Sequence, residues 1–387
     1  MMTEPVIVSA VRTAIAKQGG ALSEVPFYEY GAEVMTEAVK RAQLKKEEID
    51  DVIYGNCLSG GGNAARMTLL EAEFPVTVPG LTIDRQCGSS INSVALAADL
   101  IRAGRGTIFV AGGVESMSRS PHLLAPASRT YDRQPPTFVK RQLSPTKIGD
   151  PPMGITAENL AEEYNISREE QDNYAAESQR RMAKAMEEGF FVEQIVPIQV
   201  KVGKNTVLFD RDEHPRPGTS EEKLMKLRPV FKEDGSVTAG NSSGVNDGAS
   251  AVVVMSAVEA EKRGLEVMAR VVDSQVSGVD PNIMGIGPVP AVQELLKRNN
   301  LTVQDIDIVE LNEAFAAQVL ACNRILKIPH EKLNVNGGAI AHGHPIAATG
   351  GMLVAKAVYE MKRRSAKRAI VTACIGGGQG IALLLEK

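Results

Sequence analysis

The sequence predicts an α/β fold made of two similar halves, and two observations support this prediction. Short apolar segments rich in β-branched residues alternate with segments in which apolar residues recur at helical spacing. A stretch in the first half of the chain also resembles a stretch in the second half. We therefore expect two βαβ halves packed in layers about a pseudo-two-fold axis, with an inserted loop domain.

The expected strands and helices follow one another along the chain. Strands are predicted at 5–10, 51–54, 107–110, 251–255, 308–311 and 369–372. Helices are predicted at 30–42 and 93–103, where apolar residues recur every three to four positions. A further helix is expected to begin after Ser167, because Glu170 completes a capping box, and to stop at Gly189.

The internal repeat pairs residues 44–52 with residues 301–309, an offset of 257 residues. The same offset places Cys87 opposite His344, and each lies in a turn rich in Gly or Ser before an apolar helix. Residues 108–113 similarly align with 369–374 if a few insertions are allowed. If the halves pack about a two-fold axis, Cys87, His344 and Cys374 meet in one cleft. The alternative interpretation is a chance match of nine residues.

Residues 118–241 have no counterpart in the second half and are interpreted as an inserted loop domain. The two halves are then 1–117 with 242–268, and 269–387. Long insertions of this kind are usually lids or binding arms. The insertion carries two Pro pairs and a basic segment, which could also be an ordinary solvated face. The residues of that segment are Arg129, Arg133, Lys140, Arg141 and Lys147.

Composition limits the possible functions. The 387 residues include 43 Lys or Arg and 47 Asp or Glu, a net charge of −4 that argues against a nucleic-acid partner. No run of about 18 apolar residues predicts a membrane span or an export signal. The four cysteines have no CxxC spacing and are too few for a disulfide framework, so we expect reduced thiols and a cytoplasmic location.

Cys87 is a candidate nucleophile. It lies in the segment 84–90, between an apolar stretch and a helix expected to begin near Ile91. A thiol at a helix N-terminus faces the helix dipole and free N–H groups, which favour the thiolate and should lower its pKa below about 8.5. A small buried cysteine that only packs is the alternative.

His344 is the candidate base. Glycines precede it and Pro345 suits the first turn of the next helix, so the ring is held at a helix start where its pKa should be lowered. A neutral imidazole can accept a thiol proton. A metal site with His342 is a weaker alternative, because no third ligand follows at a familiar spacing, and a core or capping histidine is another.

Cys374 and Asn312 are further candidates. The segment 374–380 follows a strand, forms a glycine turn and leads into another strand, which disfavours a dinucleotide or P-loop motif. Such turns expose N–H groups that can stabilise an oxyanion, with Cys374 as a nearby titratable group. Asn312 ends the predicted strand 308–311 and offers a polar side chain at the same edge, although alone it is more often a helix cap.

Nine segments together resemble the thiolase family, in family order over essentially the whole chain. They are 8–13, 87–89, 112–118, 153–159, 239–248, 284–288, 312–316, 343–345 and 374–380. The resemblance implies acyl transfer between thiols: condensation of two acetyl-CoA molecules to acetoacetyl-CoA and CoA, or thiolysis of a 3-ketoacyl-CoA. Coenzyme A and its thioesters are then substrates, with no tightly bound cofactor or metal, and the assembly is a homodimer or homotetramer.

The resemblance also implies a role for each matching residue. Cys87 is the acylated nucleophile, His344 activates it, and Cys374 is the acid and base for the departing or attacking partner. Asn312, through an ordered water, and His344 polarise the thioester oxygen of acetyl-CoA. The N–H groups of Cys87 and Gly376 hold the other oxyanion. The implied substrate contacts are Ser243 to pantetheine, Arg216 to the nucleotide phosphates, and Met153, Met284 and Phe315 around the acyl group.

Three departures from the family pattern leave alternatives open. Ala347 and Ser90 stand where family members commonly have Gly, and Pro152 replaces a His often found in biosynthetic enzymes. A degradative 3-ketoacyl-CoA thiolase with a longer-chain preference is therefore an alternative, as is an acyl-CoA binder without turnover. A ketosynthase is disfavoured, because it needs a second His in place of Cys374.

Overall fold

Two sets of strands with the same topology form the centre of the protein, which is a computed structural model describing residues 3–131 and 134–387. In each half two parallel strands are followed by two strands added antiparallel. In this order the first half uses β3 (Asp51–Gly55), β5 (Ile108–Ser116), β9 (Asn246–Ser256) and β1 (Pro5–Thr13). The second half uses β11 (Ile308–Leu311), β12 (Arg368–Ile375), β13 (Gln379–Glu386) and β10 (Ala269–Gly278). The predicted duplication is confirmed.

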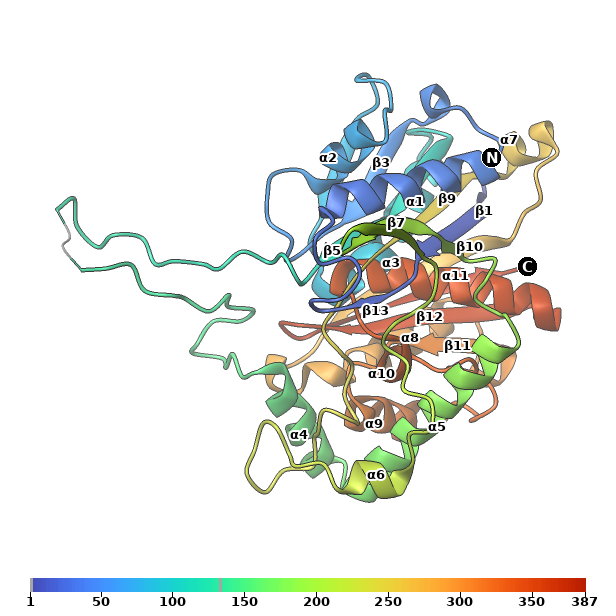
Figure 1. The fold of residues 1–387 in the computed structure, drawn as a ribbon. Helices are drawn as coiled ribbons and strands as arrows, with labels where there is room; N and C mark the ends of the chain where they lie inside the picture. Colours follow the sequence, from blue (N-terminus) through green and yellow to red (C-terminus); the bar gives the residue numbers. More distant parts are fainter. Residues whose placement is uncertain (1–2, 132–133) are drawn as a thin grey trace.

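Pairing of β1 with β10 joins the two sets into one continuous sheet, and helices cover the outer face of each set and fill the space between the sets (Figure 1). The middle layer is α3 (Ser89–Arg102) and α11 (Ile346–Arg364), which pack on each other and on strands of both halves. The outer layer of the first half contains α1 (Phe27–Arg41) and α2 (Ala64–Glu71). The outer layer of the second half contains α8 (Pro288–Arg298) and α9 (Ala316–Leu326). Three apolar cores therefore lie between these layers, where buried side chains of the helices pack on those of the strands.

The insertion between β5 and β9 has two parts. An arm, residues 119–131 and 134–147, projects from the body, and Leu124 and Phe138 form an isolated bridge between its two sides (Figure 1). The rest wraps the second half with α4 (Met153–Glu163), α5 (Arg168–Glu187) and α6 (Glu221–Met225), and adds the hairpin of β7 (Ile198–Val202) and β8 (Asn205–Phe209). Arg133 of the predicted basic segment lies outside the described residues.

The remaining elements are short. They are β2 (Ala16–Lys17), β4 (Gly80–Ile83), β6 (Ile195–Val196), α7 (Ala257–Arg263) and α10 (Ala339–His342), with 3₁₀ turns at Lys46–Glu48, Gln86–Gly88, Pro281–Ile286 and Val303–Asp305. β4 is the edge strand of the first half. None of the helices in the described ranges is long and apolar enough to cross a bilayer.

Element boundaries differ from the predictions mainly where small residues are buried. β5 continues to Ser116 and β9 begins at Asn246, because these polar and glycine-containing extensions pair with each other. Helix α3 begins at Ser89, earlier than predicted. The capping box of α5 is confirmed, with Ser167 and Glu170 bonded reciprocally, and Gly189 follows the helix at φ +72°.

Candidate active site

The equivalent starts of α3 and α11 bring Cys87 and His344 together. Both α3 and α11 begin two residues after these side chains, so the offset of 257 residues is preserved in the fold. Nε2 of His344 lies 3.2 Å from Sγ of Cys87. This is hydrogen-bond contact between a thiol and an imidazole from opposite halves, as the repeat predicted.

Two side chains outside the predicted set hold His344. Asn246 accepts a hydrogen bond from the His344 backbone N–H at 2.9 Å. Thr349 Oγ1 lies 2.7 Å from Nδ1 of the ring. Gly343 has φ +98°, and a Cβ there would lie 2.6 Å from the carboxamide of Asn246, so only glycine fits beside this clamp. The motif 239–248 contains Asn246, but local spacing gave no sign of this contact.

Asn312 lies at the same imidazole edge, as predicted. Its backbone N–H donates to the carbonyl of Thr372, which fixes it at the end of β11. Its Nδ2 lies 3.3 Å from Nε2 of His344. Its buried Oδ1 has no hydrogen-bond partner among the described residues, so it is free to bind a water or a substrate.

Cys374, near the end of β12, and Gly376, in the turn between β12 and β13, complete the cluster. Cys374 is fully buried, and its pKa is raised by burial and by the charge that a Cys87 thiolate would carry nearby. The backbone N–H groups of Gly376 and Cys87 lie by the Cys87 sulfur and favour its thiolate. Two N–H groups converging on one sulfur are the arrangement expected of an oxyanion site beside it.

The expected lowering of the Cys87 pKa is wrong. Burial raises the pKa of this thiol to about 12 and outweighs the two N–H groups that favour the thiolate. The His344 pKa is lowered to about 4, as expected in direction, but the cause is burial. The pair is therefore a neutral thiol and a neutral imidazole at rest, and the thiolate forms by proton transfer.

The turn that carries Cys87 has a strained backbone. Gln86 has φ +44°, in the left-handed region that non-glycine residues rarely adopt. Oδ1 of Asp84 accepts bonds from the Gln86 backbone N–H at 3.0 Å and from its side-chain amide at 2.7 Å. Asp84 therefore stabilises the conformation that presents the thiol at the start of α3.

A buried carboxylate, Glu115, was not singled out from the sequence. Its oxygens accept bonds from the N–H groups of Cys57, Leu58 and Ser59, and from that of Ala347 at 3.3 Å. Burial raises its pKa. Glu115 links the turn beside Cys87 to the first turn of α11, and so joins the two halves at the site.

Of the predicted acyl-pocket residues, Met153 lies beside the glycine turn. A Cβ on Gly376 would lie 2.9 Å from Leu143 and 3.6 Å from the sulfur of Met153, so both side chains cover this turn. Met284 and Phe315 are buried in the same apolar core, against which Met153 packs. Arg216 is exposed and lies outside the Cys87–His344–Cys374 cluster.

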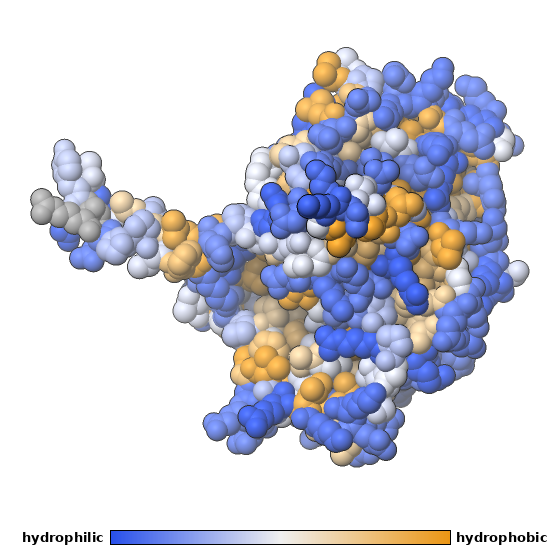
Figure 2. Space-filling model, in the orientation of Figure 1, coloured by the Kyte–Doolittle hydropathy of each residue, from blue (hydrophilic) through white to orange (hydrophobic). Residues whose placement is uncertain are grey.

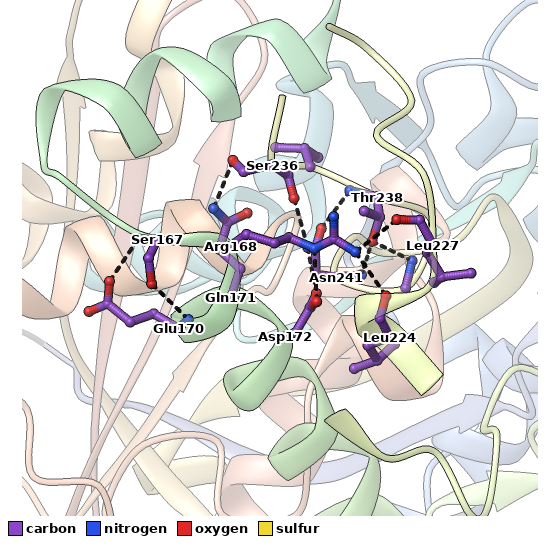
Figure 3. Close-up of polar contacts among 12 residues, drawn as sticks. Ser167, Arg168, Glu170, Gln171, Asp172, Leu224, Leu227, Ser236, Thr238 and Asn241 are labelled. Carbon is purple, nitrogen blue, oxygen red and sulfur yellow. Dashed lines mark hydrogen bonds and ion pairs between the residues drawn. The ribbon is translucent and has the colours of Figure 1, made fainter. Parts of the chain in front are cut away.

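A polar network at the start of α5 includes Asn241, two residues before Ser243 (Figure 3). Arg168 pairs with Asp172 at 2.8 Å, and Asp172 accepts a bond from Asn241 at 2.9 Å. Asn241 in turn accepts a bond from the N–H of Ala316, and Ser243 donates its own N–H to Ala314. The network therefore holds the segment before Ser243 against the loop that follows Asn312.

The three departures are accommodated by packing. Ser90 is buried and accepts a bond from the Gly351 N–H at 2.8 Å, so its hydroxyl links α3 to α11. Ala347 is buried and bonded to Glu115. Pro152 caps the N-terminus of α4 without a side-chain hydrogen bond.

His342 places Nδ1 against the carbonyl of Gly343, and no metal-ligand cluster occurs in residues 3–131 and 134–387.

Comparisons with known proteins agree on the family and the fold of the chain. The family models described as "Thiolase, N-terminal domain" and "Thiolase, C-terminal domain" match residues 5–258 and 265–387. An acetyl-CoA acetyltransferase of Syntrophomonas wolfei and the beta-ketothiolase BktB of Cupriavidus necator are each 46% identical, covering 100% of both chains. The crystal structure of the Bacillus anthracis acetyl-CoA acetyltransferase has a TM-score of 0.95 at 45% identity, covering 100% of this chain and 99% of that one. Human mitochondrial 3-ketoacyl-CoA thiolase in complex with CoA has a TM-score of 0.93 at 41% identity, covering 100% and 98%.

Proposed function

The chain belongs to the thiolase family, and from that premise we propose that Cys87 is its acyl-carrying nucleophile and His344 the base that activates it. The enzyme is a CoA-dependent acyltransferase that catalyses thioester Claisen condensation and the reverse thiolysis. The observation that carries the assignment is the 3.2 Å contact between Nε2 of His344 and Sγ of Cys87. Asn312 at the same nitrogen and the N–H groups of Cys87 and Gly376 supply the two oxyanion sites.

The first half-reaction transfers an acyl group to the enzyme. The thiol proton of Cys87 moves to Nε2 of His344, and the thiolate attacks the thioester carbonyl of acyl-CoA. The oxyanion is stabilised by the N–H groups of Cys87 and Gly376 until the bond from the carbonyl carbon to the CoA sulfur breaks. The departing CoA thiolate takes a proton from Cys374. The enzyme then holds an acyl-Cys87, an imidazolium and a Cys374 thiolate.

The second half-reaction uses the groups left in those states. The Cys374 thiolate removes a proton from the methyl group of acetyl-CoA, and His344 with Asn312 stabilises the enolate oxygen. The enolate carbon attacks the acyl carbon on Cys87 and forms the new carbon–carbon bond. The bond to the Cys87 sulfur breaks, and the Cys87 thiolate recovers its proton from His344. Each group returns to its starting state, and the reverse sequence is thiolysis.

Alkylation of Cys87 tests these roles directly. We expect iodoacetamide to modify Cys87 stoichiometrically, acetyl-CoA to protect it, and a C87A variant to lose turnover. The matched control is C57A, which removes a neighbouring buried thiol that no step uses. An unreactive Cys87 with bound CoA thioester would instead support an acyl-CoA binder. Normal turnover by C87A would overturn the assignment of the nucleophile.

We infer a preference for the acetyl group. Leu143 and Met153 cover Gly376 beside Cys87, and Met284 and Phe315 belong to the apolar core against which Met153 packs. We expect this packing to leave space for a short acyl chain. The degradative alternative requires room for longer chains. Thiolysis rates for acetoacetyl-CoA and for a C6 to C12 series of 3-ketoacyl-CoA substrates separate the two, since a longer-chain enzyme would have higher kcat/KM with the series.

The CoA moiety is assigned to the loop domain at residues 118–241 and to the segment that follows it. Ser243 suits a contact with the pantetheine arm, because the network at α5 fixes its segment beside Phe315. Arg216 is exposed and suits the nucleotide phosphates. An R216A variant should raise the KM for CoA with little change in kcat, whereas R228A, an exposed arginine that the proposal does not use, should not.

A homodimer or homotetramer is also proposed. The edge strand β4 carries Leu81, 42% exposed, beside Met67 and Leu70 of α2. The arm exposes further apolar side chains, which Figure 2 shows on its surface. Open edges and apolar patches of this kind are usually covered by another chain. Light scattering on a size-exclusion column would give the assembly size.

A cytoplasmic location is supported by the four free cysteines.

A further inference from the structure

Thr349 contacts the one ring nitrogen of His344 that does not face the reacting groups. Its side chain is fully buried in the first turn of α11, and its Oγ1 lies 2.7 Å from Nδ1. We propose that Thr349 is a positioning residue that fixes the tautomer of His344, so that Nε2 keeps its lone pair toward Cys87. The inference rests on the proposed role of His344 as the base.

The partners at Nε2 determine which nitrogen carries the hydrogen. The amide nitrogen of Asn312, at 3.3 Å, can only donate, and the thiol of Cys87, at 3.2 Å, presents its S–H. Nε2 must therefore accept. A neutral imidazole has one N–H, so this hydrogen lies on Nδ1 and Thr349 Oγ1 accepts it.

The opposite tautomer is disfavoured by the same contacts. If the Thr349 hydroxyl donated to Nδ1, the ring would direct an N–H from Nε2 at the N–H group of Asn312. Two donors would then face each other in a buried site, which is costly. Burial also lowers the pKa of His344 to about 4, so the ring is neutral at ordinary pH and its tautomer decides whether it can act as a base.

A hydroxyl also suits a reaction that runs in both directions. A carboxylate at Nδ1 would stabilise the imidazolium and retard return of the proton to Cys87. Thr349 is uncharged, so it orients the ring without raising its basicity. The buried carboxylate of Glu115 bonds the Ala347 N–H and not the ring. Among the described residues, the titratable group in hydrogen-bond contact with the ring is the thiol of Cys87.

Two matched variants test the proposal. T349V keeps the side-chain shape but cannot accept the Nδ1 hydrogen, whereas T349S keeps the acceptor. We expect T349V to lower kcat for thiolysis and the rate of Cys87 alkylation by about 10- to 100-fold, because a general base typically contributes about 10²–10⁴-fold. KM should stay within about twofold, and T349S should be close to the wild type.

Ring ¹⁵N chemical shifts give a readout that a merely structural role would not move. The wild type should show a protonated Nδ1 and an unprotonated Nε2 for His344, assigned by loss of the signals in H344Q, and T349V should show both tautomers. A wild-type Nε2–H tautomer, a T349V enzyme with unchanged kcat, or equal losses in T349V and T349S would overturn the proposal. If T349V does not fold, the wild-type tautomer decides.

Failure of the proposed function has a different signature. If Cys87 in the wild type were unreactive, or if C87A turned over normally, the assignment of the nucleophile would fail whatever Thr349 does. A reactive, acetyl-CoA-protected Cys87 whose alkylation is unaffected in T349V would leave that assignment intact and refute only the role of Thr349.

Discussion

Adding one methyl group at Gly350 should separate the two helices that present Cys87 and His344. Gly350 lies in α11 where it crosses α3, and a Cβ there would lie 2.5 Å from Cγ1 and 2.6 Å from the backbone nitrogen of Ile91. Ordinary contact begins at 3.4 Å. The backbone of α3 cannot rotate away as a side chain can, so G350A requires a shift of about 0.8 Å between the helices.

Two opposing terms set the stability of G350A. Replacing a helical glycine by alanine gains about 0.5–1 kcal/mol of helix propensity. Overpacking a close contact costs about 1–3 kcal/mol. We expect the second to prevail and G350A to lose about 1–2 kcal/mol while remaining folded. Because a misplacement of about 1 Å at a reacting pair can cost about 10²-fold in rate, kcat should fall by about that factor.

The assay is thiolysis of acetoacetyl-CoA together with denaturant unfolding. The matched control is G62A, since a Cβ at Gly62 meets open space and that residue has no left-handed φ. G62A should resemble the wild type in both measurements. If G350A kept kcat within about twofold of the wild type, the contact between α3 and α11 would not set the distance between Cys87 and His344, and the reasoning would be refuted.

Three other perturbations have defined outcomes. The pKa of His344 is about 4 in the folded chain and about 6.5 in the unfolded chain, so the unfolded chain binds more protons between pH 4 and pH 6.5. The free energy of unfolding should therefore fall by up to about 3 kcal/mol as the pH drops from 6.5 to 4. Denaturant unfolding of H344Q should lack this part of the pH dependence. Arg12 and Asp212 form a buried ion pair with distances of 2.7 and 2.9 Å. The D212N variant leaves the Arg12 charge buried and unpaired, which should lower the free energy of unfolding by about 3–5 kcal/mol. An R12M/D212L variant that is no more stable than D212N would contradict this cause. N246A removes the acceptor of the His344 N–H and should lower kcat by about tenfold at unchanged KM for CoA in steady-state assays; a change in KM alone would contradict this role.

The architecture could be predicted because its signals are local or repeated. The strand at Ile308–Leu311 has the predicted bounds, and the offset of 257 residues relates both the first strands of the two halves and their central helices. The same offset places Cys87 opposite His344, and the two side chains are in contact. In a duplicated chain, residues that align between the two repeats occupy equivalent places in the two halves. The spacing of residues within a single motif gives no such information about the fold.

The remainder depended on tertiary contacts. Asn246 in β9 acts on His344, and Glu115 in β5 acts on the first turn of α11, each across more than 90 residues of the chain. The Cys87 pKa was predicted in the wrong direction, because a helix start is visible in sequence whereas burial by the opposite half is not. Thr349 is only five residues from His344, but its contact depends on how the chain turns at Pro345 into α11.

The meeting of Cys87 with His344 has a consequence for how direction is encoded. The two halves of a duplicated chain offer matching backbone positions. If identical residues occupied both positions, neither would be the defined proton donor or the defined proton acceptor. One substitution between the repeats removes that equivalence, so the side chains alone determine which half releases the proton and which receives it. Because the two matching positions meet each other, they form one Cys87–His344 pair and not one pair for each half.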